Sequence, residues 1–227
     1  MIKKYIQMKK FLIFILTLLI SVISTYHAKA NDDETIKALL FPQFEKGYVV
    51  LKKGYTKLPA QLNYDLIDER MLYLESDSSV NVLDASAVIS VVIGGHSFVP
   101  VNDKVFYERI EAGSNELYVC HKTKLLSRGK SAGYGSYSQT AAIGGLAIST
   151  TGGSMYLLGP EEKIDGVDES SVYIHSGKKY ERINSLKSLL KFFKSHQTEI
   201  EAYSKENKTN FSKIENVVSI VKYAFSL

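Results

Sequence analysis

A period of two in the apolar residues, repeated from about Tyr48 to about Tyr180, constrains the fold of this chain most strongly. β-Branched and aromatic residues are dense in this stretch, and turn-forming residues interrupt them about every eight to twelve positions. Such spacing is typical of short antiparallel strands that are joined by tight turns. The middle of the chain is therefore predicted to form an antiparallel β-sheet meander, either a sandwich or a partly open barrel.

The clearest hairpin is predicted in GYVVLKKGYTKLPAQLNYD, with its turn at Lys53-Gly54. Pro59 has no backbone N–H to donate, so an edge or a bulge is expected at that position of the second arm. The arm alternates between apolar and polar residues, as a half-buried strand does. Its apolar face is formed by Leu58, Ala60, Leu62 and Tyr64.

Further strands are predicted in RMLYLE, AVISVVI, HSFVPV, KVFYERI and ELYVCHKTKLL. AVISVVI (Ala87 to Ile93) is nearly all apolar, which favours a strand that is covered on both faces and ended by Gly94-Gly95. Cys120 is the only cysteine, so no intramolecular disulfide can form, and its apolar surroundings favour a packed free thiol over a nucleophile or an intermolecular bridge.

The apolar period changes to 3.6 residues beyond Asn184, which predicts a C-terminal cluster of two or three short helices. The first is expected to be capped by Asn184 or Ser185, and the second to run over about 198–205 with His196 capping one of the two. For the last helix, Ser212-Lys213-Ile214-Glu215 predicts a capping box. We expect a β-rich domain over 31–183 and a helical segment over 184–227 packed on that same domain.

The first 30 residues have the pattern of a signal peptide. Four lysines precede the apolar run FLIFILTLLISVIS, and Ala28-Lys29-Ala30 forms an A-x-A cleavage site. An uncleaved anchor is the alternative, but the run is shorter than the ~20 residues that a helix needs to span a bilayer. We therefore expect a soluble exported protein that begins near Asn31 and has no membrane span after cleavage.

Removal of this segment changes the charge of the chain. Five of the 28 lysines and arginines precede the cleavage site, whereas all 24 acidic residues follow it. The mature chain thus has 23 basic and 24 acidic residues, and a net charge of −1. Nucleic-acid binding needs a dense basic surface, and no long run of lysine or arginine is left, so nucleic acid is not an expected partner.

The stretch KSAGYGSYSQTAAIGGLAISTTGGSMYLL is unlike the rest of the chain. Gly144-Gly145 would break the helix that a phosphate-binding loop needs, and no G-x-S-x-G motif surrounds a serine. We instead expect an irregular connection over Lys130–Ser138, followed by a hairpin across Thr151-Gly152-Gly153. Either this connection is a plain surface loop or it binds a ligand, since rigid rings beside adaptable polar groups suit recognition. The candidate ligand-binding residues are Tyr134, Ser136, Tyr137 and, from another loop, His96.

Three segments resemble uncharacterised exported proteins of Gram-negative bacteria. They are GYVVLKKGYTKLPAQLNYDLIDERMLYLE, YGSYSQTAAI and INSLKSLLKFFKSHQTEIEAYSKENKTNFSKIENVVSIVKYA, which together cover about half of the mature chain. The resemblance implies an envelope location, in the periplasm or outside the cell, and one domain of strands followed by helices. It implies no activity and no catalytic residues.

The sequence favours a non-enzymatic envelope protein that binds a partner or a small ligand. The mature histidines have no metal-ligand spacing, and no motif for another cofactor is present, so we expect none. One alternative is a hydrolase or isomerase that uses His96 with Ser97, Asp103 or a distant acid. Another is an assembly role in which the last helix engages a second chain; the sequence leaves the oligomeric state open.

Overall fold

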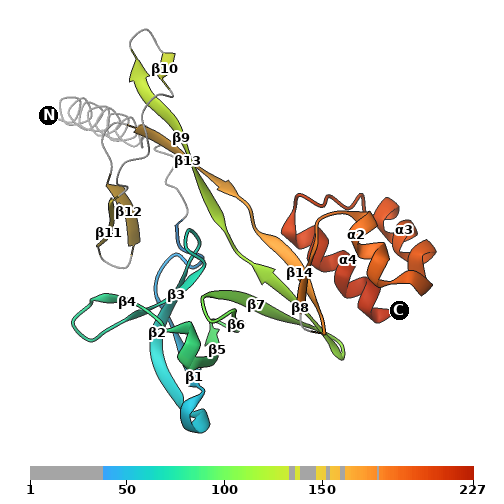
Figure 1. The fold of residues 1–227 in the computed structure, drawn as a ribbon, viewed down its shortest axis with the longest axis horizontal. Helices are drawn as coiled ribbons and strands as arrows, with labels where there is room; N and C mark the ends of the chain where they lie inside the picture. The colour runs from blue at the N-terminus through green and yellow to red at the C-terminus, as the bar shows by residue number, and fades with distance from the viewer. Residues whose placement is uncertain (1–37, 133–135, 139–146, 152–153, 159–161, 178) are drawn as a thin grey trace, which may run out of the picture. The chain divides into compact units, whose positions relative to one another are not determined.

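The computed structural model describes residues 38–227, apart from 133–135, 139–146, 152–153, 159–161 and 178, and within 127–164 it describes the backbone alone (Figure 1). The chain separates into two units, Met1–Thr35 and Ile36–Leu227, and all described residues belong to the second unit. The predicted signal peptide lies outside the described residues. None of the described helices is long and apolar enough to span a bilayer.

A ten-stranded antiparallel sheet dominates the described residues and confirms the predicted fold class. Its order is β15-β14-β8-β7-β6-β5-β1-β2-β3-β4, so most neighbours are consecutive in the chain, as in a meander. The two outermost strands are not paired with each other, and the sheet is therefore open. The strands are β1 (Glu45–Leu51), β2 (Lys57–Asp65), β3 (Arg70–Leu74), β4 (Val80–Val82), β5 (Val88–Ile93), β6 (His96–Val101), β7 (Val105–Ala112), β8 (Asn115–Cys120), β14 (Ser171–Ser176) and β15 (Lys179–Ile183).

The first predicted hairpin is confirmed by the pairing of β1 with β2. A short 3-10 helix, η1 (Lys53–Tyr55), forms the turn, and Gly54 adopts a φ of 70° there. Pro59 pairs with Tyr48 of β1, whereas β3 pairs only with Gln61–Asp65 of β2. The side of β2 opposite β1 is therefore unpaired at Pro59 among the described strands, as the missing N–H predicts.

The apolar run after Ala87 is confirmed as an interior strand, β5, which pairs with β1 on one side and with β6 on the other. Val88, Val91 and Ile93 are buried, and the remaining three residues are half-buried. Gly94-Gly95 forms the tight turn into β6, with both φ angles positive. The strand begins one residue later than predicted because Ala87 ends the short 3-10 helix η2 (Ala85–Ala87).

The stretch ELYVCHKTKLL divides into two strands at His121-Lys122. Its first half is β8, and its second half belongs to β9 (Thr123–Ala132), which pairs with β13 (Glu162–Asp168) and β10 (Ser136–Ser138) in a sheet of three strands. The predicted hairpin across Thr151 is confirmed as β11 (Ala147–Thr151) paired with β12 (Ser154–Leu158). Its turn residues lie outside the described part.

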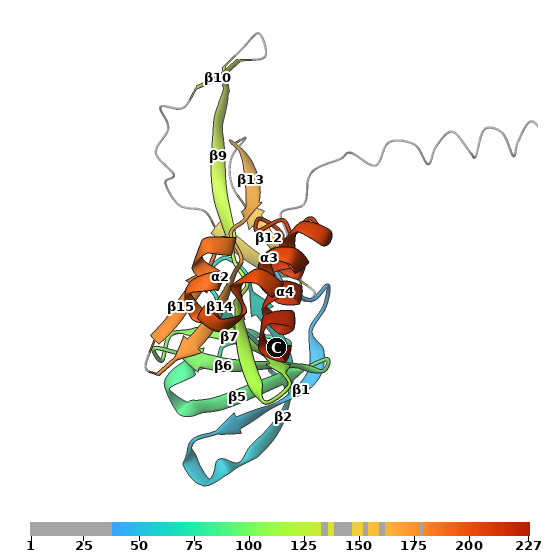
Figure 2. The ribbon, with the colours of Figure 1, turned by 90° about the vertical axis from the view of Figure 1, so that its right-hand side faces the viewer.

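Three α-helices lie at the C-terminal end of the described residues, drawn in orange to red in Figure 2. They are α2 (Leu186–Phe192), α3 (Gln197–Glu206) and α4 (Ile214–Ser226). Ser185 caps α2, since its hydroxyl accepts from the Ser188 N–H and the Ser188 hydroxyl accepts from the Ser185 N–H. A 3-10 helix, η3 (Lys194–His196), joins α2 to α3, and the His196 side chain makes no capping hydrogen bond.

The predicted capping box at Ser212 is wrong. Helix α4 begins one residue later than the box requires, with Lys213 at its N-cap position and no side-chain cap. The Asn210 side chain instead accepts from the Ser212 N–H at 2.8 Å, and the Asn210 carbonyl accepts from the Lys213 N–H at 3.0 Å. The Asn210 side chain thus takes the Ser212 N–H, which Glu215 would have accepted from in the box.

Two hydrophobic clusters lie on the same face of the large sheet. One joins Leu117, Val119, Val172 and Ile174 of β8 and β14 to the apolar faces of the three helices. The other is built from β1 to β7 around Tyr64 and Phe98, which are both fully buried and stack at 5.5 Å between ring centroids. Strand β7 contributes Phe106 to the second cluster and Ala112 to the first, and between them it carries the buried Glu108.

Candidate functional site

The residues that the sequence selected for ligand binding are only partly described. Tyr134 lies outside the described residues. Ser136 and Tyr137 form the start of β10, paired with Ala132 and Ser131, and their side chains are not described. His96 opens β6, and whether these residues share a surface stays a prediction.

His96 is hydrogen-bonded to a buried carboxylate. Its Nδ1 lies 2.6 Å from Glu108 Oε1, and the other oxygen of Glu108 lies 2.6 Å from Nε2 of His121. Glu108 is 8% exposed, whereas the His96 side chain is 48% exposed. Adjacent strands create this geometry, because β7 pairs Glu108 with Phe98 of β6 and Val119 of β8, on the face that His96 and His121 share.

The two histidines set the protonation of Glu108. Burial by itself raises the pKa of this carboxyl, but the hydrogen bonds from His121 and His96 outweigh that effect and hold the pKa below its ordinary value of 4.5. An ionised carboxylate only accepts hydrogen bonds, so His96 Nδ1–H and His121 Nε2–H each donate a hydrogen bond to it. In a neutral His96 this leaves Nε2 as a free acceptor.

Aromatic and amide groups support the polar trio, which consists of Glu108, His96 and His121. The Phe41 ring meets His96 edge-on at 5.5 Å, and Phe41 is fixed because the buried Asn63 side chain bonds both its N–H and its carbonyl. The single hydroxyl proton of Tyr64 is shared between the carbonyl of Phe106 at 2.9 Å and that of His121 at 3.1 Å. The trio is thus supported by β2, β7 and the segment before β1.

Neither of the nearby partners that the sequence named for His96 binds it. Ser97 lies on the opposite face of β6, where its hydroxyl accepts from Arg109 at 3.4 Å. Asp103 accepts from Lys52 at 3.1 Å on an exposed turn. The third option, a distant acid, is the one present, since Glu108 is twelve residues away.

A second polar group surrounds the single thiol. Cys120 is buried and free, and its Sγ donates to Glu69 Oε2 at 3.0 Å, while Glu69 Oε1 pairs with Lys122. Burial, and then the hydrogen bond to the Glu69 carboxylate, raise the pKa of the thiol far above its ordinary value. Cys120 is therefore a protonated, packed thiol, as predicted, and not an activated nucleophile.

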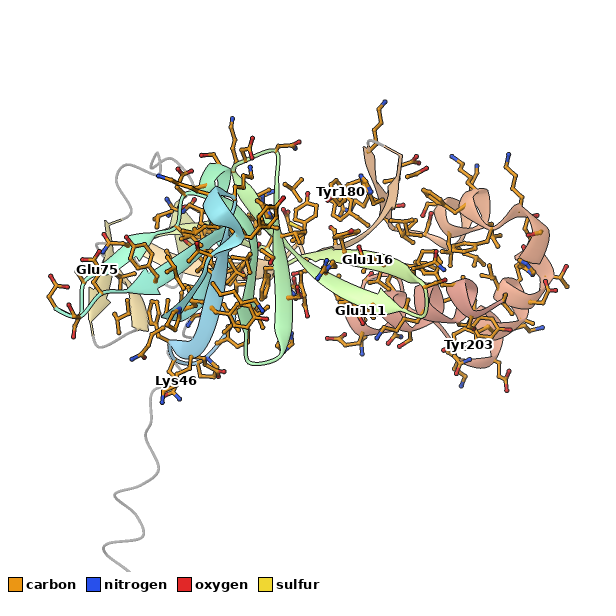
Figure 3. The ribbon with its side chains drawn as sticks, turned by 90° about the horizontal axis from the view of Figure 1, so that it is seen from below. Lys46, Glu75, Glu111, Glu116, Tyr180 and Tyr203 are labelled. Atoms are coloured by element: carbon orange, nitrogen blue, oxygen red, sulfur yellow. The ribbon has the colours of Figure 1, made fainter. Side chains whose placement is uncertain are left out.

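Tyrosines gather on the sheet face opposite the helices. Tyr107 stacks on Tyr173 at 5.0 Å, and Tyr180 meets the edges of Tyr107 and Tyr118 (Figure 3). Burial raises the pKa of Tyr107, Tyr118 and Tyr180, so their hydroxyls stay protonated at neutral pH. These are cross-strand pairs between β7, β8, β14 and β15, and they stabilise the sheet.

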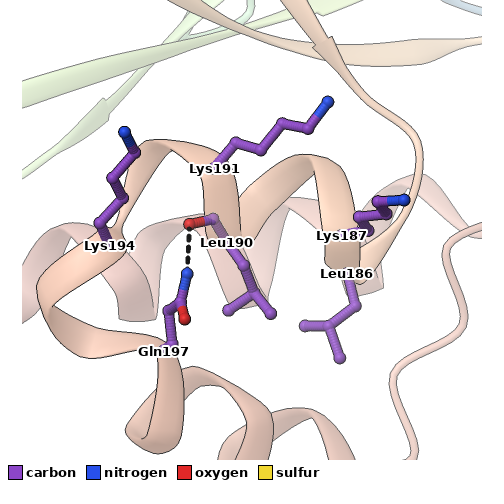
Figure 4. A pocket seen from close by; sticks show the side chains of 6 residues that line it. All are labelled: Leu186, Lys187, Leu190, Lys191, Lys194 and Gln197. Carbon is purple, nitrogen blue, oxygen red and sulfur yellow. Dashed lines mark hydrogen bonds between the residues drawn. The ribbon is translucent and has the colours of Figure 1, made fainter.

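An open groove of about 770 Å³ lies on α2 and the turn that follows it. Figure 4 shows the three lysine side chains leaving one side of this segment, whereas the two leucines extend in the other direction. The Gln197 amide closes one end by donating to the Leu190 carbonyl at 3.2 Å. We call this feature the cationic groove; it is lined by Leu186, Lys187, Leu190, Lys191, Lys194 and Gln197.

The lysines of the cationic groove lack acidic partners. No carboxylate of the described residues forms an ion pair with any of the three, and the nearby Glu199 lies 3.9 Å from His196 instead. Residues 179–194 hold five basic residues and one acidic residue, a local charge of +4. This short segment therefore carries as much net positive charge as the whole chain, which is also +4.

Sequence reasoning missed both the carboxylate between the histidines and the cationic groove. Glu108 meets its histidines only through strand pairing, and no local pattern specifies the register of that pairing. Two of the lysines had a readable signal, because Lys187 and Lys191 follow the i, i+4 spacing of one helix face, whereas Lys194 lies beyond the end of α2. A search for continuous basic runs overlooks that spacing.

No family model, no curated protein and no solved structure matches this chain. The resemblance to exported Gram-negative proteins therefore stays a prediction.

Proposed function

We propose that this chain is a non-enzymatic binding protein, exported to the Gram-negative cell envelope, that holds an anionic ligand in the cationic groove of α2. One observation carries the proposal: three lysines line a single groove, and no described carboxylate neutralises them. Lys187 and Lys191 extend from α2 and Lys194 from η3. Unpaired ammonium groups attract an anion, and each exposed contact contributes about 0.2–1 kcal/mol. Export is inferred from the first 30 residues and from the resemblance.

Replacing Lys187, Lys191 and Lys194 together by glutamine is expected to weaken the binding of anions about tenfold or more, because three charge contacts are lost. The measurement is a titration of the exported protein, followed by the NMR shifts of the α2 amides. Three separate probes are used: inorganic phosphate, pentaglutamate and octyl phosphate. The free energy of unfolding should stay within about 0.5 kcal/mol, since the three side chains are exposed.

The matched control replaces three exposed lysines outside the groove, Lys205, Lys213 and Lys222, by glutamine and so makes the same change in net charge. It should bind as the unchanged protein does. The proposal is contradicted when none of the three anions shifts the α2 amides, or when the control loses as much affinity as the groove variant.

A second candidate function, hydrolase or isomerase, is favoured by the 2.6 Å bond between His96 and Glu108. A buried carboxylate that orients a half-exposed histidine is an arrangement that general bases use. Under this candidate, His96→Ala removes turnover of a chromogenic ester or an epimerisable substrate, whereas His175→Ala, at another exposed histidine, leaves it unchanged. Equal turnover in the two variants would exclude His96 as the base.

A further inference from the structure

We propose that the end of the β1–β2 hairpin, residues 52–59, docks on the surface of an anionic lipid bilayer. All eight of these residues are exposed, and they include two of the six exposed large apolar side chains among the described residues. Tyr55 is 78% exposed and Leu58 is 45% exposed. This surface, which we call the hairpin end, lies outside the cationic groove, so the proposal does not depend on the ligand of that groove.

Tyr55 is held in a backbone conformation that bulky residues seldom adopt. Its φ is 52°, in the left-handed region, and the preceding Gly54 has a φ of 70°. Glycine or asparagine would occupy the position of Tyr55 with less strain. Since Tyr55 belongs to neither hydrophobic cluster, packing does not account for a ring at this position. A strained and exposed aromatic residue therefore supports a role for its side chain in binding.

The hairpin that carries this ring is basic. Residues 46–64 contain four lysines and no acidic residue. Lys52 pairs with Asp103 of the β6–β7 turn at 3.1 Å, but Lys53 and Lys57 form no ion pair with the described residues. Each lysine that comes close to an anionic membrane surface strengthens binding about fivefold. The two unpaired lysines thus favour an anionic surface over an uncharged one.

A bilayer surface suits the hairpin end better than a small molecule or another protein does. A small ligand needs a concave site that buries most of its surface, whereas residues 52–59 are all exposed. A specific protein interface uses about 20–30 residues on each side, and the hairpin end supplies eight. Tyrosine is favoured at the boundary between water and hydrocarbon, because its ring is apolar and its hydroxyl is polar.

A bilayer surface also accommodates side chains on both faces of the hairpin. Lys57 lies on the face of Tyr48, with its ammonium 5.0 Å from the ring centre, whereas Leu58 lies on the opposite face, paired with Val49. Lipid head groups surround an inserted hairpin end on every side, so these side chains need not point in one direction. Leu58 is two residues beyond Thr56, about 7 Å along a strand, and amphipathic segments enter a bilayer surface to a depth of about 5–10 Å.

The first test uses one tryptophan as a reporter, because the chain has none of its own. Tyr55→Trp and its control Val82→Trp, at an exposed apolar position of β4, are prepared in the chain from Asn31 onward, which lacks the apolar run FLIFILTLLISVIS. With vesicles of phosphatidylglycerol and phosphatidylethanolamine, the emission of Tyr55→Trp should move to shorter wavelength and be quenched by brominated acyl chains. The emission of Val82→Trp should not change, and neither variant should respond to phosphatidylcholine vesicles.

Co-sedimentation with the same vesicles measures what each kind of side chain contributes. Tyr55→Asn combined with Leu58→Gln should weaken binding about tenfold or more, because the apolar contacts are lost. Lys53→Gln combined with Lys57→Gln should weaken it about tenfold or more, because two charges are lost. Asparagine tolerates a positive φ, so the first variant keeps the turn, and far-UV circular dichroism verifies that both variants are folded.

The matched control for charge replaces Lys205 and Lys213, exposed lysines of the helical segment, by glutamine and should bind vesicles as the unchanged protein does. The proposal is overturned when the vesicles leave the Tyr55→Trp emission unchanged, or when both hairpin variants bind as tightly as this control. Vesicle binding that is kept in the hairpin variants but lost when the three lysines of the cationic groove become glutamine also overturns it, and assigns the lipid phosphate to that groove. Binding that is lost only in the hairpin variants supports it, whatever the groove binds.

Discussion

Replacement of Gly47 by alanine is expected to cost about 3 kcal/mol or more of unfolding free energy, a large effect for one methyl group. Gly47 lies in the middle of β1, between Ala60 of β2 and Ile93 of β5. A Cβ atom at this position would overlap the carbonyl oxygen of Val92, and it would lie 3.0 Å from Leu62 Cδ1. Because the Val92 oxygen belongs to the backbone of an interior strand, it cannot move without breaking the pairing of β1 with β5.

Urea denaturation of Gly47→Ala, followed by far-UV circular dichroism, measures this loss. The control is Gly113→Ala in the turn between β7 and β8, where a Cβ meets no atom within 4 Å. Gly113 has a φ of 67°, so the control bears only the cost of alanine in a left-handed conformation, about 1 kcal/mol. Equal losses in the two variants would contradict the close approach of β1 to Val92.

Replacement of Glu108 by alanine is expected to cost about 3 kcal/mol of unfolding free energy. The substitution removes both hydrogen bonds of the carboxylate and leaves the N–H of His121 without its acceptor. His121 is 17% exposed, so water only partly replaces the lost bond, and an unsatisfied buried donor alone costs about 1–3 kcal/mol. Chemical denaturation at pH 7 provides the measurement, with Glu111→Ala, an exposed glutamate of the same strand, as the control.

The Glu108→Gln variant separates the charge of this residue from its shape. The folded pKa of Glu108 lies below its unfolded value near 4.5, so in acid the unfolded chain binds the proton first. The stability contributed by the carboxylate is therefore present above about pH 4.5 and is lost as the pH falls through the lower, folded pKa. We expect the stability difference between the unchanged protein and Glu108→Gln to shrink as the pH falls below about 4.5. A difference that is constant with pH would show that the charge contributes nothing.

The alternation of apolar residues predicted the strands well because each strand pattern depends only on its own side chains. The first hairpin, β3, β5 and the pairing of β11 with β12 were all predictable in this way. Helix α2 was also predictable, and its cap was expected at Asn184 or Ser185, of which Ser185 is the one observed. The capping box at Ser212 failed because the Asn210 side chain competes for the same backbone groups, and a four-residue motif does not include it.

The candidate site around His96 was likewise predictable only where it depends on local sequence. His96 could be selected from the sequence as a turn histidine beside an apolar strand, but its partner could not. Ser97 is adjacent in sequence and yet faces the other side of the sheet, whereas Glu108 and His121 are distant and lie on the same side. Strand register decides such contacts, and a shift of one residue would reverse every one of them.

By itself, the sequence predicted an antiparallel sheet followed by helices, and a packed free cysteine. These properties follow from composition and from patterns shorter than one element. Tertiary structure alone decided that the sheet stays open, that two histidines bracket Glu108, and that a groove on α2 is lined by three lysines without an acidic neighbour among the described residues. The physical reason is that each depends on which strand or helix lies beside which, and no local pattern specifies that.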